Sequence, residues 1–384
     1  MIPAIPEYLG KEFKDGKKFK DAPPGHCFGL YFAIWNERTW LLEKTRKSEA
    51  LKETLSIPSE SRNQIDALRS RQQALIELTS EDARLSLEAV TTSPLATGMG
   101  MEHPLENGFA FLNPYGLPYL PSSGSKGVLR RAAEELRDER KDGWTQDAIT
   151  ELFGLESDNR QTEHTRGALT FWDTIPEIRE MGIDVMTPHY SDYYQGKSTP
   201  HDAGQPNPIV FLVIPPQSRF TFHITADLRR FNKVENWKRL MQDAFEYAFD
   251  WLGFGAKTSV GYGAMCRDLD AEAAHVRQQK EAAEREREKA EKEATLAQLD
   301  PVERSIIEFL ESRPDKNQPE ISAVMGAAKQ GKWQGEEKKA VARWLESHMR
   351  SAKLWKPQSQ AKKPEKDREH QNTLLVINWL EGKK

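Results

Sequence analysis

Four glycines surround a single Lys-Thr-Ser cluster in Trp251-Leu-Gly-Phe-Gly-Ala-Lys-Thr-Ser-Val-Gly-Tyr-Gly-Ala-Met265. Apolar residues at three- and four-residue spacing predict a helix over residues 234–251 with a cap at Asn232, and residues 262–266 predict a short strand. A glycine-rich loop therefore joins a helix to a strand. Because exposed amides in such a loop form an anion-binding concavity, we expect phosphate as its ligand. The candidate phosphate-binding residues are Gly253, Gly255, Lys257, Thr258, Ser259, Gly261 and Gly263.

Two other interpretations of this loop are open. A P-loop runs from strand to helix and carries Gly directly before Lys, whereas Ala256 precedes Lys257 here and the order of elements is reversed. The sequence therefore argues against a nucleoside triphosphatase. A helix-to-strand turn that packs against its own core would need glycines for the same conformational reasons, and would bind nothing.

A second segment, Leu117-Pro-Tyr-Leu-Pro-Ser-Ser-Gly-Ser-Lys-Gly-Val-Leu-Arg-Arg131, begins with prolines that exclude a helix and continues as a helix to about residue 141. The free amides of its first turn favour an anion. The helix dipole disfavours cations at this end, so basic residues here indicate a bound polyanion. The alternative is a solvated face that pairs with Glu134 and Glu135. The candidate caps and anion ligands are Ser122, Ser123, Ser125, Lys126, Arg130 and Arg131.

Alternating polar and apolar residues predict a strand at 83–90, and the remaining strands are predicted at 167–172, 209–214 and 219–224. The last two are expected to pair as a hairpin across the turn at residues 215–218. Reduced to its skeleton, the order is β-α-β-β-α-β, an α+β ferredoxin-like pattern whose sheet binds RNA in RNA-recognition modules. Two further helices, broken near residues 57–59, are expected as a helical insertion at about residues 38–80.

Charge is unevenly distributed along the 384 residues. The formal net charge is −4, which argues against a protein that binds nucleic acid by global charge alone, yet residues 301–384 carry 17 Lys and Arg against 12 Asp and Glu. We expect three parts: a core at residues 1–270, a charged helical linker at 271–300, and a small basic helical domain at 301–384.

Cys27 and Cys266 lie far apart without metal-ligand spacing, and no apolar run approaches the roughly 20 residues of a membrane span. The nine histidines lack HxH or HxxxH spacing. We therefore expect a cytoplasmic protein with no disulfide framework, no membrane segment, and no metal or other cofactor.

Together, the helix start at residues 117–131 and the loop at residues 251–265 resemble the RAMP superfamily of CRISPR-associated proteins. Its members carry a Pro-x-x-Pro-x-Ser-x-x-Lys-Gly-type helix start and a glycine-rich loop before the last strand. The family's usual Gly-Ser-Ser-Leu-Lys-Gly reads Ser-Ser-Gly-Ser-Lys-Gly here, which keeps Lys126. The resemblance covers roughly residues 84–268.

Three more segments look like the branch that supplies one subunit of the type III-B, or Cmr, RNA-guided effector complex. They are Met99-Gly-Met-Glu-His-Pro-Leu-Glu-Asn-Gly-Phe109, Asp184-Val-Met-Thr-Pro-His-Tyr-Ser-Asp-Tyr-Tyr194 and Pro206-Asn-Pro-Ile-Val-Phe-Leu212. The resemblance implies a non-catalytic backbone or capping subunit in antiviral defence. Its partners would be the guide RNA, held near its 3′ region, the target RNA, and the other subunits of a hetero-oligomeric Cmr complex.

The candidate phosphate ligands would then bind this RNA. The domain at residues 301–384 would dock on a partner subunit or on the 3′ end of the guide, or would fold back on its own sheet.

The insertion at residues 173–208 resembles the thumb of backbone RAMP subunits, which wedges into the guide–target duplex. Its aromatic rings would stack on bases or cover a neighbouring subunit. The candidate RNA-binding residues of the insertion are His189, Tyr190, Tyr193 and Tyr194.

RAMP relatives include endoribonucleases, so a ribonuclease that acts on guide precursor or target RNA is the alternative function. Such an enzyme needs a general acid or base within hydrogen-bond reach of a 2′-hydroxyl. The catalytic candidates for this alternative are His189, His201, Asp184 and Asp192.

Overall fold

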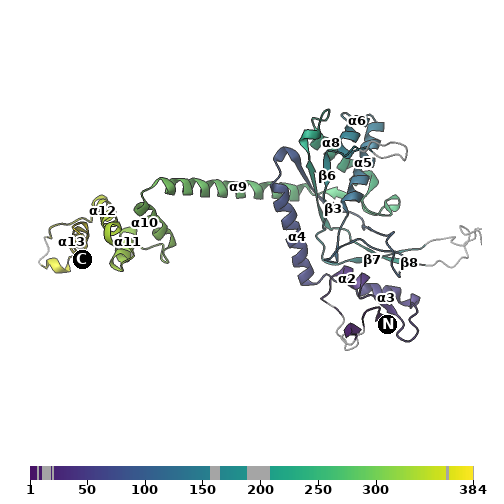
Figure 1. The fold of residues 1–384 in the computed structure, drawn as a ribbon, viewed down its shortest axis with the longest axis horizontal. Coiled ribbons are helices and arrows are strands. Elements are labelled where there is room, and N and C mark those ends of the chain that lie inside the picture. Colours follow the sequence, from purple (N-terminus) through teal and green to yellow (C-terminus); the bar gives the residue numbers. More distant parts are fainter. Residues whose placement is uncertain are drawn as a thin grey trace, which may run out of the picture. The chain divides into compact units, whose positions relative to one another are not determined.

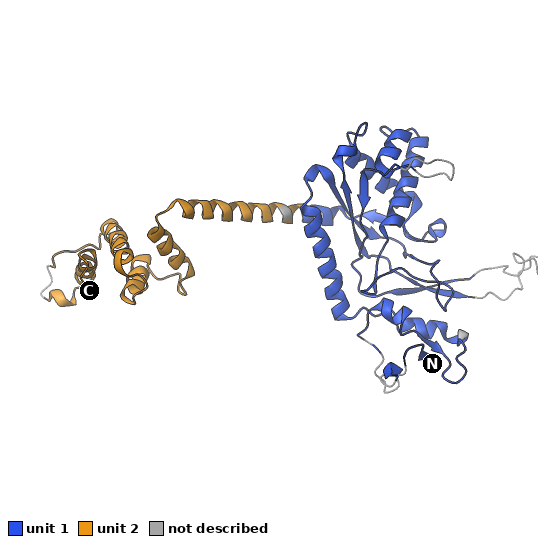
Figure 2. Cartoon of the chain, in the orientation of Figure 1, with its two compact units in different colours: residues 1–275 blue, residues 276–384 orange. Residues whose placement is uncertain are grey.

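The computed structural model describes residues 1–6, 8–10, 19, 21–155, 165–187, 208–359 and 363–383, apart from the side chains of residues 44 and 279. The chain divides into two compact units, Met1–His275 and Val276–Lys384 (Figure 2). Each unit buries a separate cluster of apolar side chains, so each has a hydrophobic core of its own.

The first unit combines one main sheet with helices and short two-stranded sheets (Figure 1). Its strands are β1 (Ile2–Pro3), β2 (Ala33–Trp35), β3 (Arg84–Thr91), β4 (Phe111–Leu112), β5 (Leu117–Pro118), β6 (Leu169–Phe171), β7 (Gly182–Met186), β8 (Ile209–Val213), β9 (Arg219–Ala226) and β10 (Met265–Arg267). Its α-helices are α2 (Pro24–Gly29), α3 (Lys47–Lys52), α4 (Ser59–Glu77), α5 (Ser122–Asp138), α6 (Gln146–Phe153) and α8 (Trp237–Tyr247). Shorter helical turns are η1 (Lys44–Arg46), η2 (Glu81–Ala83), η3 (Leu228–Arg230), the π-helix η4 (Ala248–Leu252) and η5 (Thr258–Val260).

The main sheet has four antiparallel strands in the order β10-β3-β9-β6. The buried residues of β3 alternate with partly exposed ones, and Leu87 lies opposite the buried Phe222 of β9. Helices α5 and α8 contribute Leu129 and Phe245 to the same core (Figure 1). One face of the sheet is therefore packed against helices, and the predicted α+β architecture is confirmed.

The predicted hairpin between residues 209–214 and 219–224 is wrong. β8 pairs with β7 in a separate two-stranded sheet, which we call the ribbon, with Ile183 opposite Leu212. β9 lies between β3 and β6 in the main sheet. A strand has two hydrogen-bonding edges, and both edges of β9 are occupied, so none is left for β8. A hairpin signal in the sequence cannot reveal that competition.

The helix before the glycine-rich loop is shorter than predicted. α8 begins at Trp237 instead of residue 234, so its N-cap residue is Asn236 and the predicted cap at Asn232 is wrong. The backbone amide of Asn232 donates to Glu151, in the segment before the helix. The chain then continues as the π-helix η4. The last strand begins at Met265 instead of residue 262, because Gly263 still belongs to the turn, with φ of +70°.

Two α-helices, α3 and α4, form between residues 38 and 80, where two helices were predicted, and residues 53–58 separate them. The first, α3, has only six residues, whereas α4 has 19. Ile57 and Ile65 are buried in the core of the first unit. The insertion is therefore part of that core.

The second unit is helical. It contains α10 (Pro301–Ser312), α11 (Glu320–Lys329), α12 (Gly335–Ser351), η6 (Pro364–Lys366) and α13 (Arg368–Leu380). Trp333 and Trp379 are buried in its core beside Leu345. The charged helix α9 (Leu269–Gln298) begins in the first unit and continues into the second. None of the described helices combines the length and apolar character that a membrane crossing requires.

Candidate nucleic-acid interface

The start of α5 is capped from outside the helix. The backbone amide of Ser122 donates to a carboxylate oxygen of Asp173 at 2.7 Å, and the amides of Gly124 and Ser125 donate to the carbonyl of Pro121. None of the candidate serines caps the helix with its side chain, and Ser125 is buried. The predicted serine cap is therefore wrong, because a carboxylate distant in sequence fills that position. Most amides of the first turn are already used.

Basic side chains nevertheless gather beside this turn. Lys126 is half-buried, and its pKa is lowered by burial and by the neighbouring charges of Arg130 and Arg166. Arg130 donates to the carbonyl of Gly154, and its guanidinium lies 6.0 Å from the ring of Phe153. We call Lys126, Arg130 and Arg166 the basic cluster. Within the described part of the chain, no ion pair joins any of these three residues to a carboxylate.

The basic cluster differs from the set predicted from the sequence. Arg131 does not join it, since its guanidinium pairs with Glu135 at 2.6 Å one turn along the helix. The sequence analysis missed Arg166 because it lies 40 residues after Lys126 and is not related to it by helical spacing. Its backbone carbonyl also accepts a hydrogen bond from Arg230 at 3.2 Å, which places a further cation nearby.

The glycine-rich loop is anchored by packing. Phe254 is fully buried, with ring centres of Phe222, Phe245 and Phe249 within 5.1 to 6.3 Å. A Cβ atom at Gly263 would overlap the carbonyl oxygen of Phe254. The interpretation of a turn packed on its own core therefore accounts for this part of the loop. Three of the candidate residues lie nearer the tip, where Ser259 and Gly261 are exposed and Thr258 is half-buried.

The loop also contacts the ribbon. Lys257 adopts a left-handed backbone conformation with φ of +61°, and its ammonium lies 2.7 Å from the sulfur of Met186 and 5.5 Å from the ring centre of Phe211. The hydroxyl of Tyr262 donates to Asp184 at 2.7 Å, and burial together with that carboxylate raises the pKa of Tyr262 to about 12. Lys257 is thus engaged with the ribbon.

The candidates in the thumb-like insertion fall into two groups. Asp184 is on β7 and accepts the Tyr262 hydrogen bond, so it serves the join between loop and ribbon. The other candidates lie outside the described residues: His189, Tyr190, Asp192, Tyr193, Tyr194 and His201.

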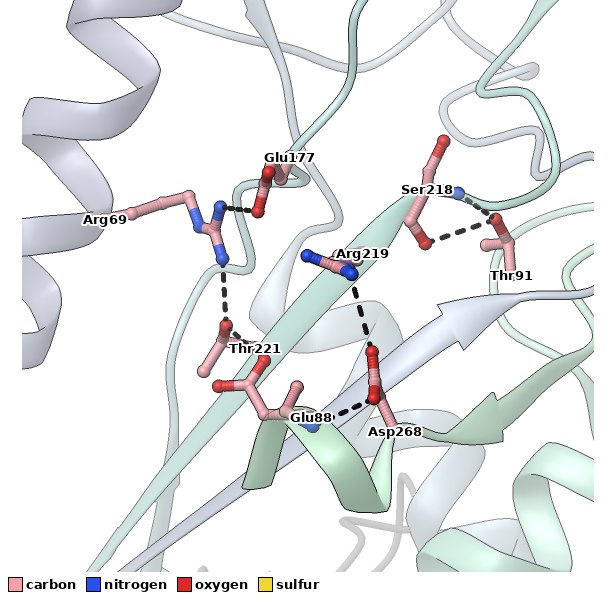
Figure 3. A network of polar contacts seen from close by, with 9 residues as sticks. Arg69, Glu88, Thr91, Glu177, Ser218, Arg219, Thr221 and Asp268 are labelled. Carbon is pink, nitrogen blue, oxygen red and sulfur yellow. Dashed lines mark hydrogen bonds and ion pairs between the residues drawn. The ribbon is translucent and has the colours of Figure 1, made fainter. Parts of the chain in front are cut away.

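The polar face of the main sheet is covered. Figure 3 shows Arg69 of α4 reaching Glu177 at 2.8 Å and Thr221 of β9 at 3.3 Å. Thr221 in turn donates to Glu88 of β3 at 2.8 Å. RNA-recognition modules use the corresponding face of their sheet to stack bases. Here Arg69 of α4 contacts that face.

Two titrating groups are buried under this cover. Burial raises the pKa of Glu88. Burial, with the nearby His275 and Arg69, lowers the pKa of His223 to about 4, and a ring nitrogen of His223 lies 2.8 Å from the hydroxyl of Ser86. His223 is therefore neutral in the folded protein near pH 7. Among the described residues, no group of three or more His, Cys, Asp or Glu side chains could hold a metal ion.

Residues 88–266 match the family model of the RAMP superfamily. This range includes most of the main sheet, the basic cluster and the glycine-rich loop. This part of the first unit is therefore RAMP-like, as the segments at residues 117–131 and 251–265 indicated.

Two curated relatives make the likeness more specific. The chain is 26% identical over 231 residues to the CRISPR system Cmr subunit Cmr6 of Pyrococcus furiosus, a match that covers 46% of this chain and 65% of that protein. It is 33% identical over 161 residues to the CRISPR system CMR subunit Cmr6 of Saccharolobus solfataricus, which covers 41% of this chain and 47% of that protein. Together with the superfamily match, these relatives support a Cmr6-like RAMP protein.

A cryo-EM structure of the type III-B Cmr-beta bound to cognate target RNA contains a similar chain, with a TM-score of 0.42 and 25% sequence identity over 58% of this chain and 70% of that one. The matches span less than two thirds of the length of each curated relative.

Proposed function

We propose that this chain is a non-catalytic, RNA-binding backbone or capping subunit of a cytoplasmic type III-B CRISPR effector complex. It would hold the guide RNA, near its 3′ region, and the guide–target duplex in antiviral defence. The basic cluster is the observation that carries this proposal. The strand order of the main sheet is the one expected of a ferredoxin-like RAMP core, which supports the same assignment.

An anion bound beside these three cations would offset the repulsion among them. Burial lowers the pKa of Lys126, and the nearby charges of Arg130 and Arg166 lower it further. Arg130 is held by Gly154, which leaves Lys126 and Arg166 as the groups that can turn toward a ligand. The phosphates of an RNA backbone supply negative charge at regular intervals and suit such a cluster without reading sequence.

Lys126→Ala combined with Arg166→Ala should weaken binding of guide RNA about tenfold near physiological salt, by removing two phosphate contacts. The slope of log K against log salt should fall by about 1.4 for single-stranded RNA, since each contact contributes about 0.7. Fluorescence anisotropy at several salt concentrations measures both quantities.

The matched control is Arg38→Ala combined with Arg71→Ala, which removes two exposed cations elsewhere on the first unit. This control should leave the affinity and the slope nearly unchanged. Equal losses in the two double variants would show that only total charge matters. An unchanged slope in the cluster variant would remove the basic cluster from the interface.

The alternative function, a RAMP endoribonuclease, makes a different prediction. We expect the purified protein neither to trim guide precursor nor to cut target RNA. His189→Ala, His201→Ala and Asp192→Asn should each leave the activity of the assembled complex within about twofold. A roughly thousandfold loss in any of them, about 4 kcal/mol of transition-state stabilisation, would favour the ribonuclease. Gel assays with labelled guide precursor and target RNA decide between the two.

A further inference from the structure

The opposite end of α5 carries a surface of the contrary charge. A hollow of about 550 Å³ lies between the last residues of α5 and the carboxyl end of α8 with η4. Its lining includes Leu136, Glu139, Asp243, Glu246, Asp250 and Trp251. We call it the acidic groove.

The carboxylates of the acidic groove are only partly neutralised. Glu246 pairs with Arg267 at 3.2 Å, and Asp243 lies 3.9 Å from Arg239. The Asp243 oxygen in that pair is buried and accepts no hydrogen bond in the described part of the chain. Lys141 is the cation in the lining itself.

The negative charges of the other carboxylates in the groove have fewer partners. Among the described residues, no ion pair involves Glu139 or Asp250. The hydroxyl of Tyr247 lies 2.9 Å from Glu135 and 3.2 Å from Glu139, but it has one proton to donate, so it cannot satisfy both carboxylates at once. Both helices also end here, and the carboxyl end of a helix favours cations. The carboxylates of the groove can therefore bind a further positively charged group.

Trp251 gives the acidic groove an aromatic wall. Its side chain is 77% exposed, whereas its neighbours Ala248 and Phe249 in the same π-helix are buried. An indole ring is the best aromatic partner for a guanidinium or ammonium group, and a ring left in water can still bury about 150–250 Å² on contact. Tryptophan and arginine are also the residues that most often dominate binding energy at protein interfaces.

We propose that the acidic groove docks a basic segment of another protein subunit, with an arginine or lysine side chain stacked on Trp251 and paired with Glu139 and Asp250. RNA does not fit this surface, because its phosphates would meet carboxylates. Lys126 and Glu139 are 13 positions apart on one helix, or about 20 Å. The proposed RNA-binding surface at the basic cluster and the proposed protein-binding surface at the acidic groove thus lie at opposite ends of α5.

The identity of the partner rests on the proposed function, which makes it a subunit of the same type III-B complex. The test is co-expression of the tagged full chain with the other subunits and guide RNA, followed by purification and quantitative mass spectrometry. Glu139→Lys combined with Asp250→Lys should reduce recovery of the neighbouring subunit at least tenfold, and so should Trp251→Ala. Anisotropy of the isolated variants with guide RNA should stay within twofold of the parent chain.

Matched controls are Glu60→Lys combined with Glu102→Lys for charge, and Leu78→Ala for an exposed apolar residue. Both should assemble normally. A photo-crosslinking amino acid at position 251 should attach to a lysine- or arginine-rich segment of one other subunit. Attachment to RNA or to a second copy of this chain would overturn the proposal, as would normal assembly of the groove variants.

Failure of the proposed function has a separate signature. If the parent chain recovers neither guide RNA nor any subunit, both proposals are wrong. If the parent chain assembles and the groove variants assemble equally well, only the docking proposal is wrong. Circular dichroism melting of each variant confirms that a loss of recovery does not come from unfolding.

Discussion

Gly263→Ala should lower the free energy of unfolding of the first unit by about 3 kcal/mol or more. Gly263 has φ of +70°, a conformation that costs an L-residue about 1–2 kcal/mol. The added Cβ would also overlap the backbone carbonyl of Phe254, which cannot move aside because its ring is locked among other phenylalanines. Forcing atoms into packed space adds about 1–3 kcal/mol.

Gly261→Ala is the matched control from the same loop. Gly261 has φ of +93°, but a Cβ there would meet nothing within 4 Å. It should therefore show the conformational cost alone, about 1–2 kcal/mol. Urea denaturation of both variants measures the difference. Equal destabilisation would mean that the close approach of residues 254 and 263 contributes nothing to stability.

Acid should destabilise the first unit through His223. An unfolded histidine titrates near its ordinary pKa of 6.5, whereas His223 in the folded protein has a pKa of about 4. Between these values the unfolded state binds more protons, so stability is fully present above about pH 6.5 and is lost as the pH falls toward 4. The loss between about pH 8 and pH 5 should be about 2 kcal/mol.

His223→Gln keeps a polar side chain beside Ser86 and removes the titration. Urea denaturation across this pH range should show a flatter profile for the variant, even if its stability is lower at every pH. The raised pKa of Glu88 acts in the opposite direction, since protonation of that carboxyl favours the folded state as the pH falls. Parallel profiles for the two proteins would show that His223 does not carry the acid sensitivity.

Local patterns predicted the elements of this fold well. Apolar spacing located α8 and alternation located β3, because a helix or strand exposes one face to water within a few residues of sequence. The prolines of residues 117–121 located the start of α5. The density of glycines located a loop whose backbone needs them. These signals depend only on neighbours in the chain.

What the sequence could not predict depends on residues far apart. Asp173 caps α5 across 51 positions, and Arg166 joins Lys126 from another segment. β8 pairs with β7 because both edges of β9 are taken. Lys257, a predicted phosphate ligand, lies against Phe211 of the ribbon. In each case the deciding partner comes from a loop or strand whose position follows from the completed fold.

The first turn of α9 matters to anyone who wishes to express the first unit by itself. Glu272 accepts a hydrogen bond from the Glu88 amide of the central strand at 3.2 Å and pairs with Arg267 at 2.7 Å. A protein that ends at residue 270, the predicted end of the core, lacks Glu272. The Glu88 amide and Arg267 would then each lose their contact with this carboxylate. A stop codon placed after His275 keeps both contacts, so we expect the protein that ends there to be the more stable of the two.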